Sequence, residues 1–158
     1  MPVRAGILTV SDSVSAGTSE DRSGSAILRN FPDTWEVVGT AVVPDDQRTI
    51  EDVLRAWADD DHLDAIFTTG GTGLGPRDVT PEATLALAEK TIPGIAEALR
   101  AEGLKQAPGS MLSRGVAALR GTTLIINLPG SPAGAGQGAA LLCPLIEHAI
   151  ATMHGARH

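Results

Sequence analysis

The sequence has one cysteine and no tyrosine, and aromatic residues make up only 3% of its 158 residues. A single cysteine, Cys143, excludes an intrachain disulfide and a zinc site made of several cysteines. Because Cys143 lies in an apolar stretch, we expect its thiol to pack in the core rather than to act as a nucleophile. With aromatic residues so scarce, the core must be built from alanine, leucine, isoleucine and valine.

Basic residues and long hydrophobic runs are also scarce. The 12 lysines and arginines stand against 19 acidic residues, and the net charge of −7 argues against a duplex nucleic-acid binder. The apolar run Ala5–Val10 stops at Ser11, which makes it too short for a signal peptide. The apolar stretch near the C-terminus is cut by Pro144, Glu147 and His148, so it is not expected to span a bilayer. The sequence therefore predicts no nucleic-acid partner, no membrane partner and a cytoplasmic location.

The signatures of several enzyme classes are missing as well. The histidines lack the spacing of a metal site; they are His62, His148, His154 and His158. No Gly-x-Ser-x-Gly elbow is present, so a serine hydrolase is not expected. A P-loop would need Gly-Lys-Ser/Thr where Gly75 is followed by proline and arginine. A relaxed dinucleotide pattern occurs at Gly134, Gly136 and Ala139, but no second strand or ribose-binding acid follows it, so we reject it.

What is present is enough for a folded α/β domain. Apolar residues make up 42% of the chain, and the length predicts a single domain over residues 1–158. Apolar runs bounded by turn residues predict strands over Val3–Val10, Trp35–Val43, Ala65–Thr69 and Thr122–Leu128, with a short candidate at Val116–Leu119. Helical spacing predicts helices over Gln47–Asp60, Ile92–Leu99 and Leu142–Met153, another from Pro81 with Thr80 as its N-cap, and a weaker one over Gly24–Phe31. This alternation predicts a three-layer sandwich with a mostly parallel central sheet covered by helices on both faces.

The most informative loop runs from Gly70 to Thr84 and directly follows a predicted strand. Four glycines in six positions leave backbone N–H groups open to an anion, and the loop leads into a helix N-terminus. Arg77 adds a cation and Asp78 a candidate Mg²⁺ ligand, which suits a nucleotide or a phosphorylated ligand. The alternative is a tight connection between strand and helix that needs glycine for conformational reasons alone.

Two further loops gain meaning only in combination with this one. Asp45 follows the predicted strand Trp35–Val43, and if it lies close to Asp78, the two carboxylates could hold a Mg²⁺ that bridges phosphate oxygens. Alternatively, Asp45 is only a helix cap or a first-turn charge. Ser131 and Pro132 predict another capped helix after a strand, which is either a second anion site or an ordinary helix start.

Taken together, the motifs resemble those of the molybdopterin-binding proteins of molybdenum cofactor biosynthesis. This family includes bacterial molybdopterin adenylyltransferases and the gephyrin G domain. The similarity extends from about Leu8 to Ile150. It rests on TVSDSVSAG (Thr9–Gly17), DRSG (Asp21–Gly24), VVPDD (Val42–Asp46), GGTG (Gly70–Gly73), PRDVTPEAT (Pro76–Thr84), Pro93-Gly94, LSRG (Leu112–Gly115) and LIINLPGSP (Leu124–Pro132).

The resemblance implies a molybdopterin-binding-domain-like α/β fold, a homotrimer, and adenylylation of the terminal phosphate of molybdopterin by MgATP with release of pyrophosphate. By motif position, Asp45 and Asp78 correspond to the essential acids and are the expected Mg²⁺ ligands. The expected nucleotide- and phosphate-binding residues are Gly70, Gly71, Thr72, Gly73 and Arg77, with Ser11, Asp12 and Ser13 on a second pocket loop. The expected molybdopterin-binding residues are Ser113, Arg114, Pro129, Gly130 and Ser131.

Two alternatives to an adenylyltransferase remain at this point. Some relatives bind molybdopterin without catalysis, but these often lack the Pro-Arg-Asp pattern found at Pro76–Asp78. A scaffold protein, as the gephyrin relative suggests, has no support from an additional domain or a long linker. The segment Gly103–Ser110 departs from some relatives, which leaves its pterin contacts open.

Overall fold

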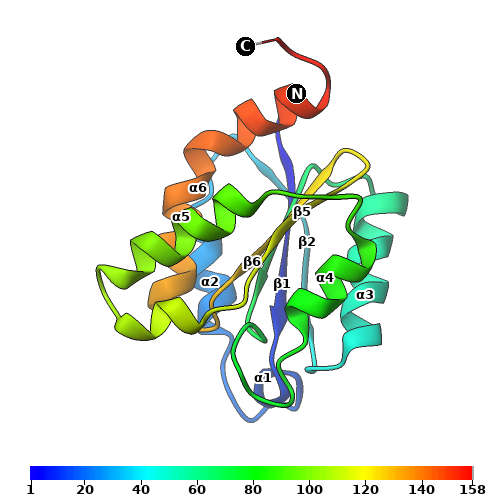
Figure 1. Cartoon of the computed structure of the whole chain (residues 1–158). Coiled ribbons are helices and arrows are strands. Elements are labelled where there is room, and N and C mark those ends of the chain that lie inside the picture. The colour runs from blue at the N-terminus through cyan, green and yellow to red at the C-terminus, as the bar shows by residue number, and fades with distance from the viewer. Residues whose placement is uncertain (158) are drawn as a thin grey trace.

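The computed structural model describes residues 1–157 and is built around one six-stranded sheet (Figure 1). The strands are β1 (Arg4–Val10), β2 (Glu36–Val43), β3 (Ala65–Thr69), β4 (Lys90–Thr91), β5 (Ala117–Arg120) and β6 (Thr123–Leu128). They lie in the order β2-β1-β3-β6-β5-β4. In this order the first four strands pair in parallel, whereas β5 pairs antiparallel with both β6 and β4. The prediction of a mostly parallel sheet is confirmed, and the five predicted strands agree with the structure to within one residue at each end.

Helices cover both faces of the sheet, as the sequence predicts. They are α1 (Asp12–Ser15), α2 (Arg22–Leu28), α3 (Gln47–Arg55), α4 (Thr80–Leu87), α5 (Pro93–Leu104) and α6 (Pro132–Met153). Helices α2, α5 and α6 lie on one face, while α3 and α4 lie on the other (Figure 1). A short 3₁₀ helix at Pro108–Leu112 follows α5. The three-layer sandwich is therefore confirmed.

Several helix boundaries differ from the expected ones. The predicted helix Gln47–Asp60 is α-helical only to Arg55 and then widens into a π-helical turn at Ala56–Asp60. In this turn the indole of Trp57 packs onto backbone of the sheet, where a Cβ at Gly6 or Gly39 would stand 2.9 Å from the ring. The helix predicted over Gly24–Phe31 begins and ends earlier, as α2. The helix expected after Ser131 and the predicted C-terminal helix form the single helix α6, which has Pro144 inside it.

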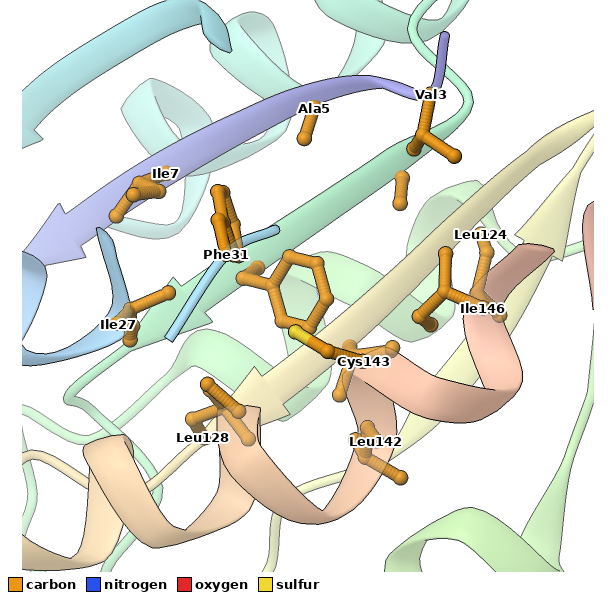
Figure 2. Packing of buried hydrophobic residues seen from close by; sticks show 14 of the residues in the cluster. Val3, Ala5, Ile7, Ile27, Phe31, Leu124, Leu128, Leu142, Cys143 and Ile146 are labelled. Carbon is orange, nitrogen blue, oxygen red and sulfur yellow. The ribbon is translucent and has the colours of Figure 1, made fainter. Parts of the chain in front are cut away.

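Two apolar clusters, one on each face, hold the layers together. The larger one packs α2 and α6 against β1, β3 and β6, and Figure 2 shows Phe31, Leu128 and Ile146 within it. Cys143 is buried in this cluster, and burial raises the pKa of its thiol to about 11. This confirms that Cys143 is a core residue, because a thiol with a raised pKa is a poor nucleophile at neutral pH.

No helix within residues 1–157 is both long and apolar enough to cross a membrane. The prediction about His158 lies outside the described residues. Among the described residues, no group of three or more histidine, cysteine, aspartate or glutamate side chains could hold a metal ion.

Candidate functional site

Four loops meet at one edge of the sheet, because each follows the carboxyl end of a parallel strand. They begin after Val10 of β1, Val43 of β2, Thr69 of β3 and Leu128 of β6. Strand β2 lies on one side of β1 and β3 on the other, so the strand order reverses at β1. In open α/β sheets, ligands bind at such a switch point beyond the carboxyl ends of the strands. The loops that carry the predicted residues therefore lie where this type of fold binds ligands.

Asp12 and Asp45 join the first two of these loops through a reciprocal pair of hydrogen bonds. The Asp12 amide donates to Oδ2 of Asp45 at 2.9 Å, and the Asp45 amide donates to Oδ1 of Asp12 at 3.0 Å. Arg77 comes from the third loop and donates to both oxygens of Asp12, at 3.1 and 2.9 Å. Asp12 thus links three loops, and Arg77 is paired with Asp12 rather than extending freely from its loop.

The pKa values of Asp12 and Asp45 are shifted in opposite directions by their surroundings. Hydrogen bonds from the Arg77 side chain and then from the Asp45 amide lower the pKa of Asp12. Burial raises the pKa of Asp45, with smaller contributions in the same direction from the charges of Asp12 and Asp78, against the lowering effect of the Asp12 amide. Asp45 is therefore a carboxylate whose negative charge is poorly compensated by the protein alone.

We expect Asp45→Asn to raise the melting temperature of the ligand-free, metal-free protein at about pH 7. Because the pKa of Asp45 is raised in the folded state, its ionised form opposes folding, and the amide removes that charge while keeping an acceptor for the Asp12 amide. Each kcal/mol relieved would add about 2–4 °C.

The sign of this effect depends on pH. As the pH falls through the raised pKa of Asp45 towards that of an unfolded aspartate, the wild-type carboxyl becomes neutral and the advantage of asparagine disappears. Thermal unfolding of both proteins from neutral to acidic pH measures this. An equal difference in melting temperature at every pH would contradict the assignment.

Asp78 lies on the loop Gly70–Val79, which folds around its carboxylate. The Gly75 amide donates to Oδ2 of Asp78 at 2.9 Å. A Cβ at Gly73 or at Gly75 would stand 2.9 Å from the same oxygen, closer than Cβ atoms normally approach. The absence of a side chain at both positions thus lets the backbone pass close to the carboxylate.

The sequence prediction for Thr80 at the base of this loop is wrong. Thr80 was expected to be an N-cap, but it is the first residue of α4, and its buried hydroxyl donates to the carbonyl of Gly70 at 2.9 Å. Its amide also donates to the carbonyl of Gly71 at 3.1 Å. Closing the loop competes for the threonine hydroxyl, so the helix starts without a side-chain cap.

The loop Gly70–Val79 and its surroundings offer both hydrogen-bond donors and carboxylates to a ligand. Within residues 1–157, the amides of Gly71, Thr72 and Gly73 donate to no other protein group. A Cβ at Gly71 would stand 3.2 Å from Oδ1 of Asp45, which places this second carboxylate against the start of the same loop. The loop thus brings together unpaired backbone donors and the carboxylates of Asp45 and Asp78.

These two carboxylates could supply part of the coordination shell of a magnesium ion. Each of the two carboxylates has one oxygen bonded to a backbone amide, from Asp12 or from Gly75, and each has a second oxygen. Mg²⁺ prefers oxygen ligands and is usually bound by one or two carboxylates together with phosphate oxygens.

Residues of the loop Gly70–Val79 line two cavities. The larger, of about 390 Å³, lies between α5, the 3₁₀ helix Pro108–Leu112 and the start of α6. Of the predicted residues, it is lined by Thr72, Gly73, Ser113, Pro129 and Ser131. The smaller, of about 340 Å³, lies at the ends of β1 and β3, and Ser11, Gly70 and Gly130 line it. Eight of the fifteen predicted residues thus line one or the other of these two cavities.

Seven predicted residues line neither cavity: Asp12, Ser13, Asp45, Gly71, Arg77, Asp78 and Arg114. The contacts of Asp12, Asp45, Arg77 and Asp78 are those given above. Gly71 lies against Asp45 in the loop. The Ser13 hydroxyl lies 3.2 Å from the Ser11 hydroxyl. Arg114 uses its side chain to hold carbonyls of the Gly70–Val79 loop and the carboxylate of Glu82.

Sequence reasoning missed most of the wall of the larger cavity. Leu99 and Arg100 of α5 line it, together with Gly103, Gln106 and Ser110 from the segment whose pterin contacts stayed open. Arg100 donates to the carbonyls of Ser113 and Gly115 at 3.3 and 3.2 Å. None of these residues belongs to a glycine-rich or acidic motif, and only the helical spacing of Leu99 hinted at a buried position.

Comparison with known proteins agrees with this geometry. Residues 6–148 match the family described as a probable molybdopterin binding domain. The chain is 40% identical over 134 residues to the molybdopterin adenylyltransferase of Haemophilus influenzae, a match that covers 82% of this chain and 68% of that protein. It is also 40% identical over 148 residues to the molybdenum cofactor synthesis protein cinnamon of Drosophila melanogaster, covering 92% of this chain but only 24% of that longer protein.

Among solved structures, the molybdopterin biosynthesis enzyme MoaB of Thermus thermophilus superimposes with a TM-score of 0.91. It is 47% identical in sequence, and the match covers 98% of each chain. The sheet, both helical layers and the loops at the switch point are therefore arranged as in a molybdopterin biosynthesis protein.

Proposed function

The chain belongs to the molybdopterin-binding domain family of molybdenum cofactor biosynthesis, and from this premise we propose that it is a molybdopterin adenylyltransferase. In the proposed reaction, an oxygen of the terminal phosphate of molybdopterin attacks the α-phosphorus of ATP. The bond between the α-phosphorus and the oxygen bridging to the β-phosphorus breaks, and pyrophosphate leaves. The products are adenylyl-molybdopterin and pyrophosphate.

One observation carries this proposal: the carboxylates of Asp45, from the loop after β2, and of Asp78 lie against the loop Gly70–Val79, whose amides at Gly71–Gly73 donate to no protein group within the described residues. Phosphoryl and nucleotidyl transfer need alignment and neutralisation of charge more than a strong base. Backbone N–H groups that are fixed before the substrate arrives meet this need without reorganisation. The acidic net charge of the protein is no obstacle, because the loop supplies positive potential locally.

Asp45 and Asp78 would hold Mg²⁺, which when bound supplies positive charge to the triphosphate and raises the electrophilicity of the attacked phosphorus. The amides of Gly71–Gly73 would orient the phosphate oxygens. Arg77 is exposed, and its partner Asp12 is exposed as well, so their ion pair contributes little stability. Arg77 can therefore exchange Asp12 for a phosphate oxygen at low cost.

The larger cavity is the proposed site for the pterin, since Ser113, Pro129 and Ser131 line it. Its volume of about 390 Å³ is in the range of small-molecule sites. Thr72 and Gly73 line the same cavity, which brings the proposed pterin site next to the phosphate loop. A homotrimer, which the resemblance implies, and a cytoplasmic location, which the sequence predicts, complete the proposal.

The rival proposal is a non-catalytic carrier of molybdopterin. Incubating the purified protein with molybdopterin, ATP and Mg²⁺ and searching for adenylyl-molybdopterin by mass spectrometry separates the two. The adenylyltransferase predicts a product that needs all three components. Molybdopterin bound without any adenylylated product would favour the carrier.

A further inference from the structure

Arg114 ties together both arms of the loop that carries Asp78. Its Nε donates to the carbonyl of Gly73 at 2.8 Å, and a terminal guanidinium nitrogen donates to the carbonyl of Asp78 at 2.9 Å. Its backbone amide donates to the carbonyl of Thr72 at 2.8 Å. Three contacts from one residue therefore span the loop from its first arm, at Thr72 and Gly73, to Asp78 on the second.

The guanidinium is itself held from a second direction. Its other terminal nitrogen contacts both carboxylate oxygens of Glu82 on α4, at 2.6 and 3.2 Å. The backbone on either side of Arg114 is fixed by Arg100 of α5, which donates to the carbonyls of Ser113 and Gly115. Arg114 thus connects the Asp78 loop to a helix on each face of the sheet.

We infer that Arg114 is a positioning residue that sets the place of the Asp78 carboxylate and of the adjoining loop amides. This inference rests on the proposed function and deepens it. The resemblance places Arg114 among molybdopterin-binding residues, but each of its side-chain nitrogens donates to a group of the protein. Its role is therefore to fix the geometry of the site rather than to touch the substrate.

Only arginine can make this set of contacts. The planar guanidinium points separate N–H groups at Gly73, Asp78 and Glu82 at the same time. Lysine has one nitrogen on a flexible stem and cannot reach all three partners. Arg114→Lys should therefore behave like Arg114→Ala rather than like the wild type.

Arg120 offers a matched control within the same chain. Arg120 also forms a bidentate ion pair, with the Asp59 carboxylate at 2.9 and 2.7 Å. It also donates a hydrogen bond to the Leu87 carbonyl at 3.2 Å. It lies beyond the opposite edge of the sheet, where β5 turns into β6. Arg120→Ala thus removes a similar set of contacts without touching the loop.

The test compares Arg114→Ala, Arg114→Lys, Glu82→Gln and Arg120→Ala with the wild type in three measurements. The first is hydrogen–deuterium exchange of residues 72–79 in the ligand-free protein, where the amides of Gly75 and Asp78 donate hydrogen bonds within the loop. The second is the affinity for molybdopterin without ATP. The third is kcat together with the Mg²⁺ concentration that gives half-maximal rate.

A positioning role predicts faster exchange over residues 72–79 in both Arg114 variants and in Glu82→Gln, but not in Arg120→Ala. It predicts unchanged molybdopterin affinity, a higher Mg²⁺ requirement and a kcat lower by about 100-fold in Arg114→Ala, because a displacement of about 1 Å can have that effect. Glu82→Gln removes the charge and one of the two acceptor oxygens that face Arg114, and it keeps the test informative if the Arg114 variants fold poorly.

Unchanged exchange over residues 72–79 would overturn the inference, as would weakened molybdopterin binding with an unchanged kcat, since that pattern indicates direct contact with the substrate. A wild-type protein that forms no product would instead refute the proposed function. The exchange and affinity measurements would still decide whether Arg114 orders the loop, because they need no turnover.

Discussion

Asp78→Asn is expected to lower the rate of adenylyl-molybdopterin formation by about 100- to 1,000-fold, the usual effect of removing one group that stabilises charge in a transition state. The substitution keeps an oxygen that can accept the hydrogen bond from the Gly75 amide, so the loop should stay folded. What it removes is the negative charge that would bind Mg²⁺ and the triphosphate. Asp45→Asn should have a similar effect for the same reason.

Asp64 supplies a matched control for this prediction. Its carboxylate also accepts a hydrogen bond from a backbone amide, that of Arg4 at 2.8 Å, but it lies at the opposite edge of the sheet, before β3. Asp64→Asn should leave the rate unchanged. Raising the Mg²⁺ concentration should partly restore Asp78→Asn. Turnover of Asp78→Asn at the wild-type rate would contradict the assignment of Asp78.

Gly70→Ala is expected to be the most destabilising single substitution in the loop. Gly70 has a φ of +97°, and a Cβ there would collide with the backbone carbonyl of Val10 at the end of β1. A positive φ costs a residue with a side chain about 1–2 kcal/mol, and overpacking adds about 1–3 kcal/mol. The carbonyl of Val10 belongs to a central strand and cannot move aside, so the free energy of unfolding should fall by about 2–5 kcal/mol.

Gly121→Ala separates the effect of the collision from that of the backbone conformation. Gly121 also has a positive φ, of +56°, but nothing lies within 4 Å of a Cβ at that position. It should therefore lose only the conformational part, about 1–2 kcal/mol. Denaturant unfolding of both variants measures the difference. Equal losses would mean that the contact between Gly70 and Val10 is less close than described.

The sequence predicts the layers of this fold well because they depend on local patterns. Strands β1, β3 and β6 are apolar runs because both faces of this part of the sheet are buried, whereas the edge strand β2 is only partly buried. Strand β4 was not predicted, since Lys90 and Thr91 are exposed and too few to form a pattern. Their pairing with β5 is set by the neighbouring strand and not by their own composition.

The residue types of the site could be predicted from the sequence, but the contacts between their side chains could not. Glycines, acids and an arginine after strands indicate a phosphate-binding edge, and the resemblance picks out Asp45 and Asp78. The pairing of Asp12 with Arg77, 65 residues away, and of Arg114 with Glu82, 32 residues away, depends on tertiary structure. No sequence spacing encodes such pairs, so Arg114 was interpreted as a ligand contact from its motif alone.

The most direct test of the account follows the label from ATP in single-turnover reactions with molybdopterin and Mg²⁺. One reaction contains ATP labelled at the α-phosphate, and a parallel one contains ATP labelled at the γ-phosphate. The account predicts that the α-label appears in molybdopterin and that the γ-label appears in pyrophosphate. Both labelled products should form much more slowly with Asp78→Asn. Molybdopterin that is bound but carries no α-label, or that acquires the γ-label, would contradict adenylyl transfer at this site.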